Sequence, residues 1–457
     1  MRERGAFGGL LPKIKVMGGC SGLRILLISY AFPPYNDIGH VRVGKVAKYL
    51  QRFGHEIRVL TAADQPFAAS LPVEIPEQDV VRTPWWNVNR PAEIAFGGRG
   101  KVVEGGLESQ GAFRPLVQML RVIYRVIYKG WISFPDDQIG WLPFAVRAGS
   151  RLVEGWRPDV LYASALPYTS LVVAHLVAKR YNLPWIGELR DLWVDFHRYH
   201  IGRVRQCIER RLERRVLSSA AGLVTVSEPM ASLLREKYCK PTAVVLNGYD
   251  PEDYLPRTAP IPGGGDLRLV YTGMVYESRH DPGMLFEALR FLGAEAHDVR
   301  VEFYGRYVGI VKELAVQYAV DHLVSIKGQI PYKDSLRMQQ EADALVLFLW
   351  TDPEERGVYS GKLFEYIGAG RPILAIGGMD TVAADLIAER GLGAVCKTSV
   401  EIAMQLRTWL EAKRNRGSVP APALEAGIGL TREAQARQLE SFLNEVVPKR
   451  TSSQATS

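Results

Sequence analysis

The chain has 457 residues, of which 47% are hydrophobic and 23% charged. This length and composition predict a folded protein with more than one core and exclude a disordered chain. No apolar run approaches the roughly 18 residues of a membrane-spanning helix. The net charge of +8 indicates an anionic partner, and the chain lacks zinc-finger spacing and an RNA-binding aromatic signature. A phosphorylated substrate or an acidic lipid is therefore expected rather than a nucleic acid.

The cysteines show no pattern of paired metal ligands. They are far apart in the chain, at Cys20, Cys207, Cys239 and Cys396. This spacing predicts neither a zinc site nor a disulfide framework and favours a reducing cytoplasm. We expect no metal and no bound cofactor. Residues 1–22 are rich in glycine and basic residues without a continuous apolar core, and they are predicted to be a flexible extension rather than a signal peptide.

Residues 23–257 are predicted to form a first α/β domain. An apolar run at 23–29, an amphipathic stretch at 41–53 and a second apolar run at 56–61 predict a strand, a helix and a strand. The same alternation continues with a strand at 159–163, a helix at 170–181, and strands at 185–189, 222–226 and 243–246. It is typical of a doubly wound parallel sheet.

A Pro- and Gly-rich segment at 258–266 is predicted to be a linker to a second α/β domain at 267–430. The elements expected there are strands at 267–272, 299–304, 323–327, 344–348, 373–376 and 394–396, with helices at 281–291 and 308–318. Thr431 is a candidate cap for a last helix at 431–447, which we expect to pack back on the first domain, and 448–457 is predicted to be a disordered tail. Two such domains leave a cleft at the carboxyl ends of their strands, where ligands of these sheets bind.

The segment from Tyr359 to Pro372 is predicted to be a capped helix between two strands. Ser360 is the candidate N-cap, and Gly361 lets a ligand approach the first backbone N–H groups, where the helix dipole favours a phosphate. Lys362 adds a positive charge, and Glu365 on the next turn is suited to accept hydrogen bonds from sugar hydroxyls. An ordinary capped helix with a solvated Lys–Glu pair is the alternative.

The run GKLFEYIGAGRPIL at 361–374 resembles the donor-site motif of family 4 of the retaining glycosyltransferases, which have the GT-B fold. Other segments fall in that family's order: Phe32-Pro-Pro before Gly39 and Arg42, then 158–164, 183–193, 226–227, 247–248 and 271–273. The resemblance spans roughly residues 23–447. It implies two Rossmann-like domains, the first on the acceptor side, and transfer of a hexose-type sugar from a nucleoside diphosphate-sugar to a glycan or lipid-linked acceptor with retention. Polysaccharide or glycolipid biosynthesis would be the setting.

The resemblance also implies a donor site. It comprises Gly273, Arg279, Tyr359, Ser360, Gly361, Lys362 and Glu365. Glu365 matches the residue that binds the ribose in that family. The family's sugar-binding glutamate falls at Gly357, and its two phosphate-binding cations fall at Met274 and Arg279, so that only Arg279 keeps the charge. Sugar contacts are therefore expected from other groups, such as backbone N–H groups near Tyr359 and Ser360.

Two clusters of the first domain are predicted to face the cleft. Gly39 begins the helix that carries Arg42 and Lys45, and these residues are expected to hold an anionic acceptor group or the donor phosphate. A close turn with exposed cations is the alternative.

A second cluster lies at the end of the strand predicted at 185–189, where α/β sheets place working side chains. It comprises Glu188, Arg190 and Asp191. The alternative is an Arg–Asp pair that only fixes the loop. The catalytic set expected from both clusters is Gly39, Arg42, Arg190 and Asp191. Retention is compatible with the departing diphosphate taking the acceptor proton, so no separate base is expected.

The stretch at 114–129 has Arg121, Arg125 and Lys129 at helical spacing among apolar residues. It predicts a helix lying on an anionic membrane surface, which would place the protein peripherally at the cytoplasmic face. A helix packed on the first domain with its basic edge in water is the alternative.

Two further functions remain open at this level. A sugar-nucleotide epimerase can have the same architecture. A degenerate, non-catalytic scaffold that binds a membrane or a partner is favoured by Gly357 and Met274, which lack the charges of the family's site.

Overall fold

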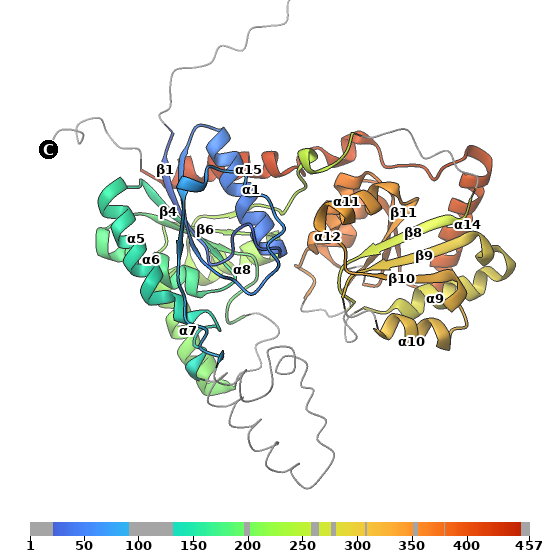
Figure 1. The fold of residues 1–457 in the computed structure, drawn as a ribbon, viewed down its shortest axis with the longest axis horizontal. Helices are drawn as coiled ribbons and strands as arrows, with labels where there is room; N and C mark the ends of the chain where they lie inside the picture. The colour runs from blue at the N-terminus through green and yellow to red at the C-terminus, as the bar shows by residue number, and fades with distance from the viewer. Residues whose placement is uncertain are drawn as a thin grey trace, which may run out of the picture.

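The computed structural model describes residues 22–90, 131–195, 202–256, 265–275, 280–306, 309–350, 355–378 and 380–448. They form two α/β domains, each built on a parallel sheet with helices packed against it (Figure 1). The predicted fold of two Rossmann-like domains is confirmed.

The first domain has a seven-stranded sheet in the order β3-β2-β1-β4-β5-β6-β7. Its strands are β1 Arg24–Ile28, β2 Glu56–Ala62, β3 Val80–Thr83, β4 Val160–Ala165, β5 Trp185–Leu189, β6 Gly222–Thr225 and β7 Thr242–Val244. Its helices are α1 Ile38–Arg52, α5 Leu142–Trp156, α6 Thr169–Tyr181, α7 Arg203–Leu217 and α8 Glu228–Tyr238. The central strands β4 and β5 are buried at every position because both faces of the sheet are covered.

The second domain has a six-stranded sheet in the order β10-β9-β8-β11-β12-β13. Its strands are β8 Leu267–Thr272, β9 Val299–Tyr304, β10 Val324–Gly328, β11 Ala344–Phe348, β12 Ile373–Ile376 and β13 Gly393–Cys396. Its helices are α9 Pro282–Leu292, α10 Gly309–Gln317, α11 Tyr332–Glu341, α12 Gly361–Ala369, α13 Val382–Glu389 and α14 Ser399–Arg416. The strand order reverses beside β8, and such a switch point opens a crevice at the carboxyl ends of the strands.

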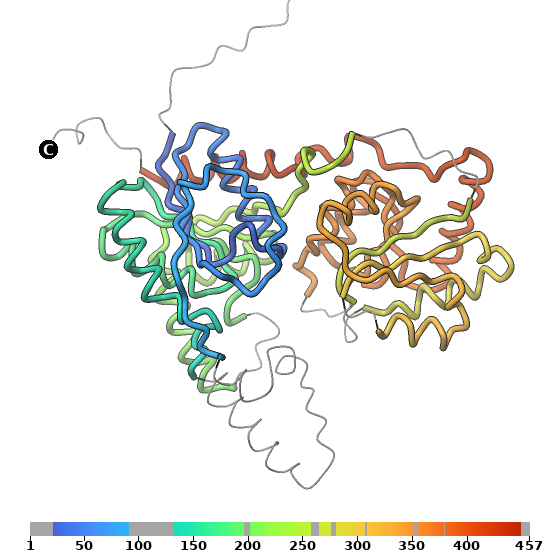
Figure 2. Tube along the Cα trace, in the orientation of Figure 1, coloured from blue at the N-terminus to red at the C-terminus, as the bar shows by residue number. Residues whose placement is uncertain are grey.

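The last helix, α15 Arg432–Val446, crosses from the second domain back to the first (Figure 2). Thr431 caps it by accepting a hydrogen bond from the Ala434 N–H at 3.1 Å. Leu439, Phe442 and Leu443 are buried in the same core as β1 and α1. The two domains are therefore joined at two places, by the chain that follows β7 and by the segment that leads into α15.

Several predicted segments lie outside the described residues. They are the N-terminal extension apart from Gly22, the basic stretch at 114–129, most of the linker at 258–266, and the tail after Pro448. Among the described helices, none is both long and apolar enough to cross a membrane.

Candidate active site

A cavity of about 480 Å³ lies between the two domains. The first domain lines it with the turn before α1 and with the end of β5, through residues that include Asp37, Ile38, Arg190 and Asp191. The second domain lines it with the ends of four strands and with the start of α12. The cavity thus occupies the position that the two-domain prediction gave to the ligand.

The N-termini of α1 and α12 meet at this cavity. A Cβ atom added to Gly361, the first residue of α12, would lie 2.6 Å from Cδ1 of Ile38, the first residue of α1. Any side chain at position 361 would therefore displace Ile38 or the adjoining domain. Ser360 occupies the N-cap position as predicted, but its side chain makes no capping hydrogen bond. The N–H group of Leu363 donates to the Ser360 carbonyl at 3.1 Å. The N–H groups of Gly361 and Lys362 precede it and have no intrahelical acceptor, so they are suited to an anion.

Lys362 reaches into the cavity across Gly273, the residue that follows β8. A Cβ atom on Gly273 would lie 2.2 Å from Cε of Lys362, and the backbone of Gly273 has a φ of 123°. Only glycine combines this conformation with this close approach. The Lys362 ammonium lies 5.4 Å from the centre of the Tyr271 ring. Burial lowers the pKa of Lys362, and the nearby Glu365 carboxylate opposes that shift.

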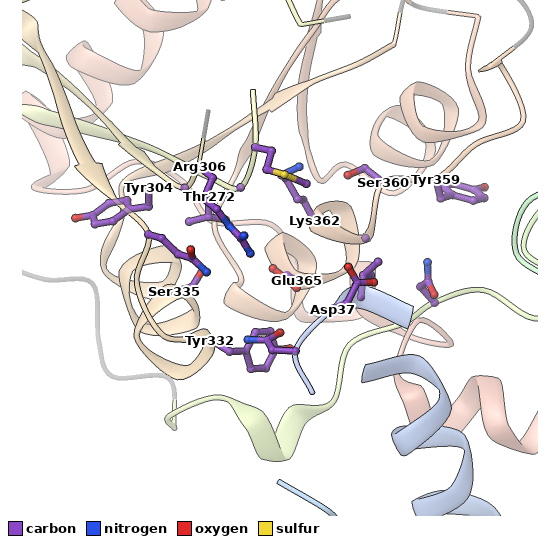
Figure 3. Close-up of a pocket in the computed structure, with 18 of the residues that line it drawn as sticks. Asp37, Thr272, Tyr304, Arg306, Tyr332, Ser335, Tyr359, Ser360, Lys362 and Glu365 are labelled. Carbon is purple, nitrogen blue, oxygen red and sulfur yellow. The ribbon is translucent and has the colours of Figure 1, made fainter. Parts of the chain in front are cut away.

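Glu365 lies one turn further along α12 and faces the same space (Figure 3). The side-chain amide of Gln339 donates a hydrogen bond to its Oε2 at 3.2 Å and another to Thr272 Oγ1 at 3.0 Å. The Tyr254 hydroxyl donates to the main-chain carbonyl of Glu365 at 2.9 Å. Burial raises the pKa of the Glu365 carboxyl, while the Gln339 hydrogen bond opposes the shift. The carboxyl is thus held in place with acceptor capacity left for a ligand's hydroxyl groups.

Arg190 reaches the cavity from the first domain. Its Nε donates to the Ala165 carbonyl at 2.5 Å and its Nη2 to the Leu166 carbonyl at 3.0 Å. A Cβ atom on Gly39 would lie 2.3 Å from Nη1 of Arg190, so the glycine leaves room for the guanidinium over the first turn of α1. Burial lowers the pKa of Arg190, and Glu188 and Asp191 oppose that shift. Gly39 and Arg190 therefore form one unit at the cleft.

The prediction that Arg42 faces the cleft is wrong. Its side chain is 1% exposed and forms an ion pair with Glu188, with Nη2 and Oε1 2.7 Å apart. The guanidinium also donates to the carbonyls of Val245 and Leu246. Arg42 lies on the side of α1 that faces the sheet. Its guanidinium donates hydrogen bonds to other groups of the protein, so Arg42 ties α1 to β5 and to the loop after β7.

Lys45 does not face the cleft either. Its ammonium lies 2.7 Å from carboxylate oxygens of Glu74, Asp250 and Asp253, and its side chain is 6% exposed. Glu74, Asp250 and Glu252 are the one group of three potential metal ligands found among the described residues. Lys48 bonds to all three, so the cluster is an ion-pair network that ties the segment after β7 to α1.

The other residues predicted for the site differ in where they lie. Asp191, Tyr359 and Ser360 line the cavity. Arg279 lies outside the described residues. Gly357, where the resemblance expects a glutamate, packs against the first domain, since a Cβ there would lie 3.2 Å from Cβ of Pro229 and 3.4 Å from Oγ of Ser227. A side chain at this position would lie against Ser227 and Pro229 of the first domain.

Sequence reasoning missed several residues of the cavity wall. Asn36, Asp37, Tyr304, Arg306, Tyr332 and Ser335 are among them. Arg306 comes two residues after a strand that was predicted at 299–304, and the rule that ligands bind beyond strand ends would have pointed to it. Tyr332 and Ser335 lie on α11, which the sequence analysis did not predict.

Comparison with known proteins bears on this arrangement. Residues 39–250 match the family model described as a glycosyl transferase 4-like domain. By this domain the chain is a glycosyltransferase. No curated protein matches the chain.

Several solved structures share this two-domain fold. HepE of Anabaena, solved in complex with UDP, is 15% identical, with a TM-score of 0.59 over 93% of this chain and 100% of that one. Sucrose-phosphate synthase of Thermosynechococcus elongatus is 13% identical, with a TM-score of 0.57 over 93% and 99%. A putative UDP-N-acetylglucosamine 2-epimerase of Listeria monocytogenes is 11% identical, with a TM-score of 0.52 over 93% and 96%. At these identities the likeness concerns the fold, which is the GT-B architecture.

Proposed function

We propose that this glycosyltransferase takes a sugar from a nucleoside diphosphate-sugar and transfers it to a glycan or lipid-linked acceptor with retention of configuration. The observation that carries the proposal is the start of α12, where free N–H groups, Lys362 and Glu365 face one cavity. A nucleotide sugar presents a diphosphate and a ribose diol next to each other, and these groups fit the cation and the carboxylate. The helix terminus and Lys362 would bind the diphosphate, and Glu365 would accept hydrogen bonds from the ribose.

The first domain would then face the reacting sugar and the acceptor. Arg190 is held by two neutral carbonyls, so its charge is suited to stabilise the diphosphate as it leaves. In the proposed step the bond between the anomeric carbon and the diphosphate oxygen breaks while the acceptor oxygen bonds to that carbon on the same face. The acceptor proton passes to the leaving phosphate oxygen. The protein's residues bind, orient and exclude water in this step, and it needs neither a metal nor a bound cofactor.

Support for the donor class also comes from the fold neighbours. HepE was solved with UDP and, in a second structure, with UDP-glucose. The acceptor would be a precursor in polysaccharide or glycolipid biosynthesis, and the basic stretch at 114–129 would hold the protein at an anionic membrane surface on the cytoplasmic side. Family 4 is the assignment favoured by the motif at 361–374.

Thermal denaturation with a panel of nucleotide sugars tests the donor. A ligand that binds only the native state raises the melting temperature, so at least one nucleotide sugar should raise it. Release of free nucleoside diphosphate from that nucleotide sugar should require an acceptor. If no nucleotide sugar binds, the alternative of a non-catalytic scaffold, which Gly357 and Met274 favour, replaces the proposal.

An epimerase is the second candidate, since one of the fold neighbours is a putative epimerase. It needs no acceptor. Conversion of a nucleotide sugar to its epimer in the absence of any acceptor would therefore favour this function over transfer.

A further inference from the structure

Arg306 is a cation on the wall of the cavity. It follows Gly305 at the end of β9, its side chain is exposed, and it lines the cavity wall. Among the described residues it has no hydrogen-bond or ion-pair partner. Figure 3 shows its guanidinium directed into the cavity, toward the space that Lys362 and Glu365 also face. A charged group in this position is available to a ligand.

Two glycines bring Arg306 close to Lys362. A Cβ atom on Gly305 would lie 2.0 Å from the carbonyl oxygen of Gly273, so the turns after β8 and β9 touch through their backbones. The Gly273 N–H donates to the Tyr304 carbonyl at 2.7 Å and fixes this contact. Lys362 packs on the Cα of the same Gly273. The two cations therefore come from different elements that converge on one glycine.

Among the described residues of the turn after Gly273, Met274 and Val275 carry no charge. Met274, the residue after Gly273, lines the cavity with a side chain that is 37% exposed and neutral. A ligand that lies over this turn meets a thioether flanked by an ammonium and a guanidinium. An anion that spans more than one group fits this pair better than a single carboxylate, because the guanidinium can bind two oxygens at once while the ammonium binds another.

We propose that Arg306 is a donor-binding residue that contacts the diphosphate together with Lys362. The inference rests on the proposed function, since it assigns one contact of the same donor. The diphosphate of a nucleotide sugar carries two negative charges, which the two cations match. Arg306 then supplies the positive charge that Met274 does not carry. Because it contacts the diphosphate, it lets the site distinguish nucleoside diphosphates from nucleosides.

Calorimetry on the full chain tests this assignment. Of UDP, GDP and ADP, the one that binds the wild type most tightly is compared with its own nucleoside. We expect Arg306→Ala to weaken the nucleoside diphosphate roughly 10- to 100-fold, as expected for loss of a hydrogen-bonded charge. Nucleoside affinity should stay unchanged. Placing a cation on the neighbouring turn, in the double variant Arg306→Ala with Met274→Arg, should recover part of the loss.

Arg300→Ala is the matched control. Arg300 lies at the other end of β9, where it pairs with Asp266 outside the cavity. Its removal should leave both affinities unchanged. An Arg306→Ala variant that binds the diphosphate as the wild type does overturns the inference and leaves the proposed function standing. Equal weakening of nucleoside and diphosphate overturns it too, because Arg306 would then hold the base. A wild type that binds none of the three nucleotides overturns both proposals.

Discussion

Arg42 and Glu188 form an ion pair across 2.7 Å in which both side chains are about 1% exposed. The hydroxyl of Tyr162 also donates to the Glu188 carboxylate at 2.6 Å. The Arg42 charge lowers the pKa of Glu188 against the effect of burial. The pair joins α1 to β5 inside the first domain, away from the cleft.

Removing Arg42 should cost stability rather than ligand binding. Arg42→Met leaves Glu188 buried without its partner, so we expect the free energy of unfolding to fall by about 3–5 kcal/mol in urea denaturation. The control is Arg407→Met, which breaks the exposed pair with Glu295 at 2.9 Å and should cost less than about 1 kcal/mol. A variant of Arg42 that unfolds as the wild type does but binds donor weakly would contradict the buried role.

Glu365→Gln should weaken donor binding without destabilising the fold. The amide keeps the size of the side chain but loses the charge, so donor affinity should fall about 10-fold in calorimetry, as for loss of charge-assisted hydrogen bonds. Because burial raises the pKa of Glu365, removing the charge costs the folded state little. Glu341→Gln, on α11 and outside the cavity, is the control. Equal donor affinity in the two variants would remove Glu365 from the site.

Gly273→Ala should displace Lys362. The new methyl group would clash with Cε of Lys362, because a Cβ atom at position 273 would lie 2.2 Å from it. We expect donor affinity to fall together with a stability loss of about 1 kcal/mol or more. Gly417→Ala separates the two effects, because Gly417 also has a positive φ, 75°, but has open space around it. It should lose stability alone. If both variants bind donor equally well, the position of Lys362 over Gly273 is unimportant.

Local patterns in the sequence predict the parts of the site that local physics determines. The helix at α12 is predicted because Ser360 and Gly361 directly precede an amphipathic run, and Lys362 and Glu365 then fall on its first turns. The βαβ unit at 23–61 is also predicted from a local pattern, an amphipathic stretch between two apolar runs. By contrast, β3 is a strand of four residues with one arginine, too short for a clear pattern. The helix α5 was missed although a Pro near its N-terminus is a usual start signal.

Contacts between distant segments are beyond such patterns. The sequence places Arg42 on α1, but its acceptors at Val245 and Leu246 lie about 200 positions away. Whether this arginine faces the cleft or the core depends on which segment of the folded chain packs beside α1. Here that segment is the loop after β7. The position of Arg306 likewise depends on the contact between Gly305 and Gly273, which only the assembled sheet creates.

A buried glutamate of the first domain provides a pH-dependent signal. Glu209, on α7, is 2% exposed. Trp193 Nε1 donates to its Oε1 at 3.4 Å, and the nearest guanidinium nitrogen of Arg205 lies 3.6 Å from its Oε2. Burial raises the pKa of this carboxyl from 4.5 to about 7, although the Trp193 hydrogen bond opposes the shift. The folded state therefore favours the protonated form.

Glu209→Gln should remove part of the pH dependence of stability. The protonated Glu209 carboxyl makes its full contribution to the free energy of unfolding below about pH 4.5, and this contribution is lost as the pH rises through 7. The stability of the wild type relative to the variant should therefore fall by roughly 3 kcal/mol between pH 4.5 and pH 8. Urea denaturation of both proteins across that range measures the difference. Glu236→Gln, at an exposed position on α8, controls for removal of a charge. A wild-type-minus-variant difference that stays constant with pH would show that the pKa of Glu209 is not raised in the folded state.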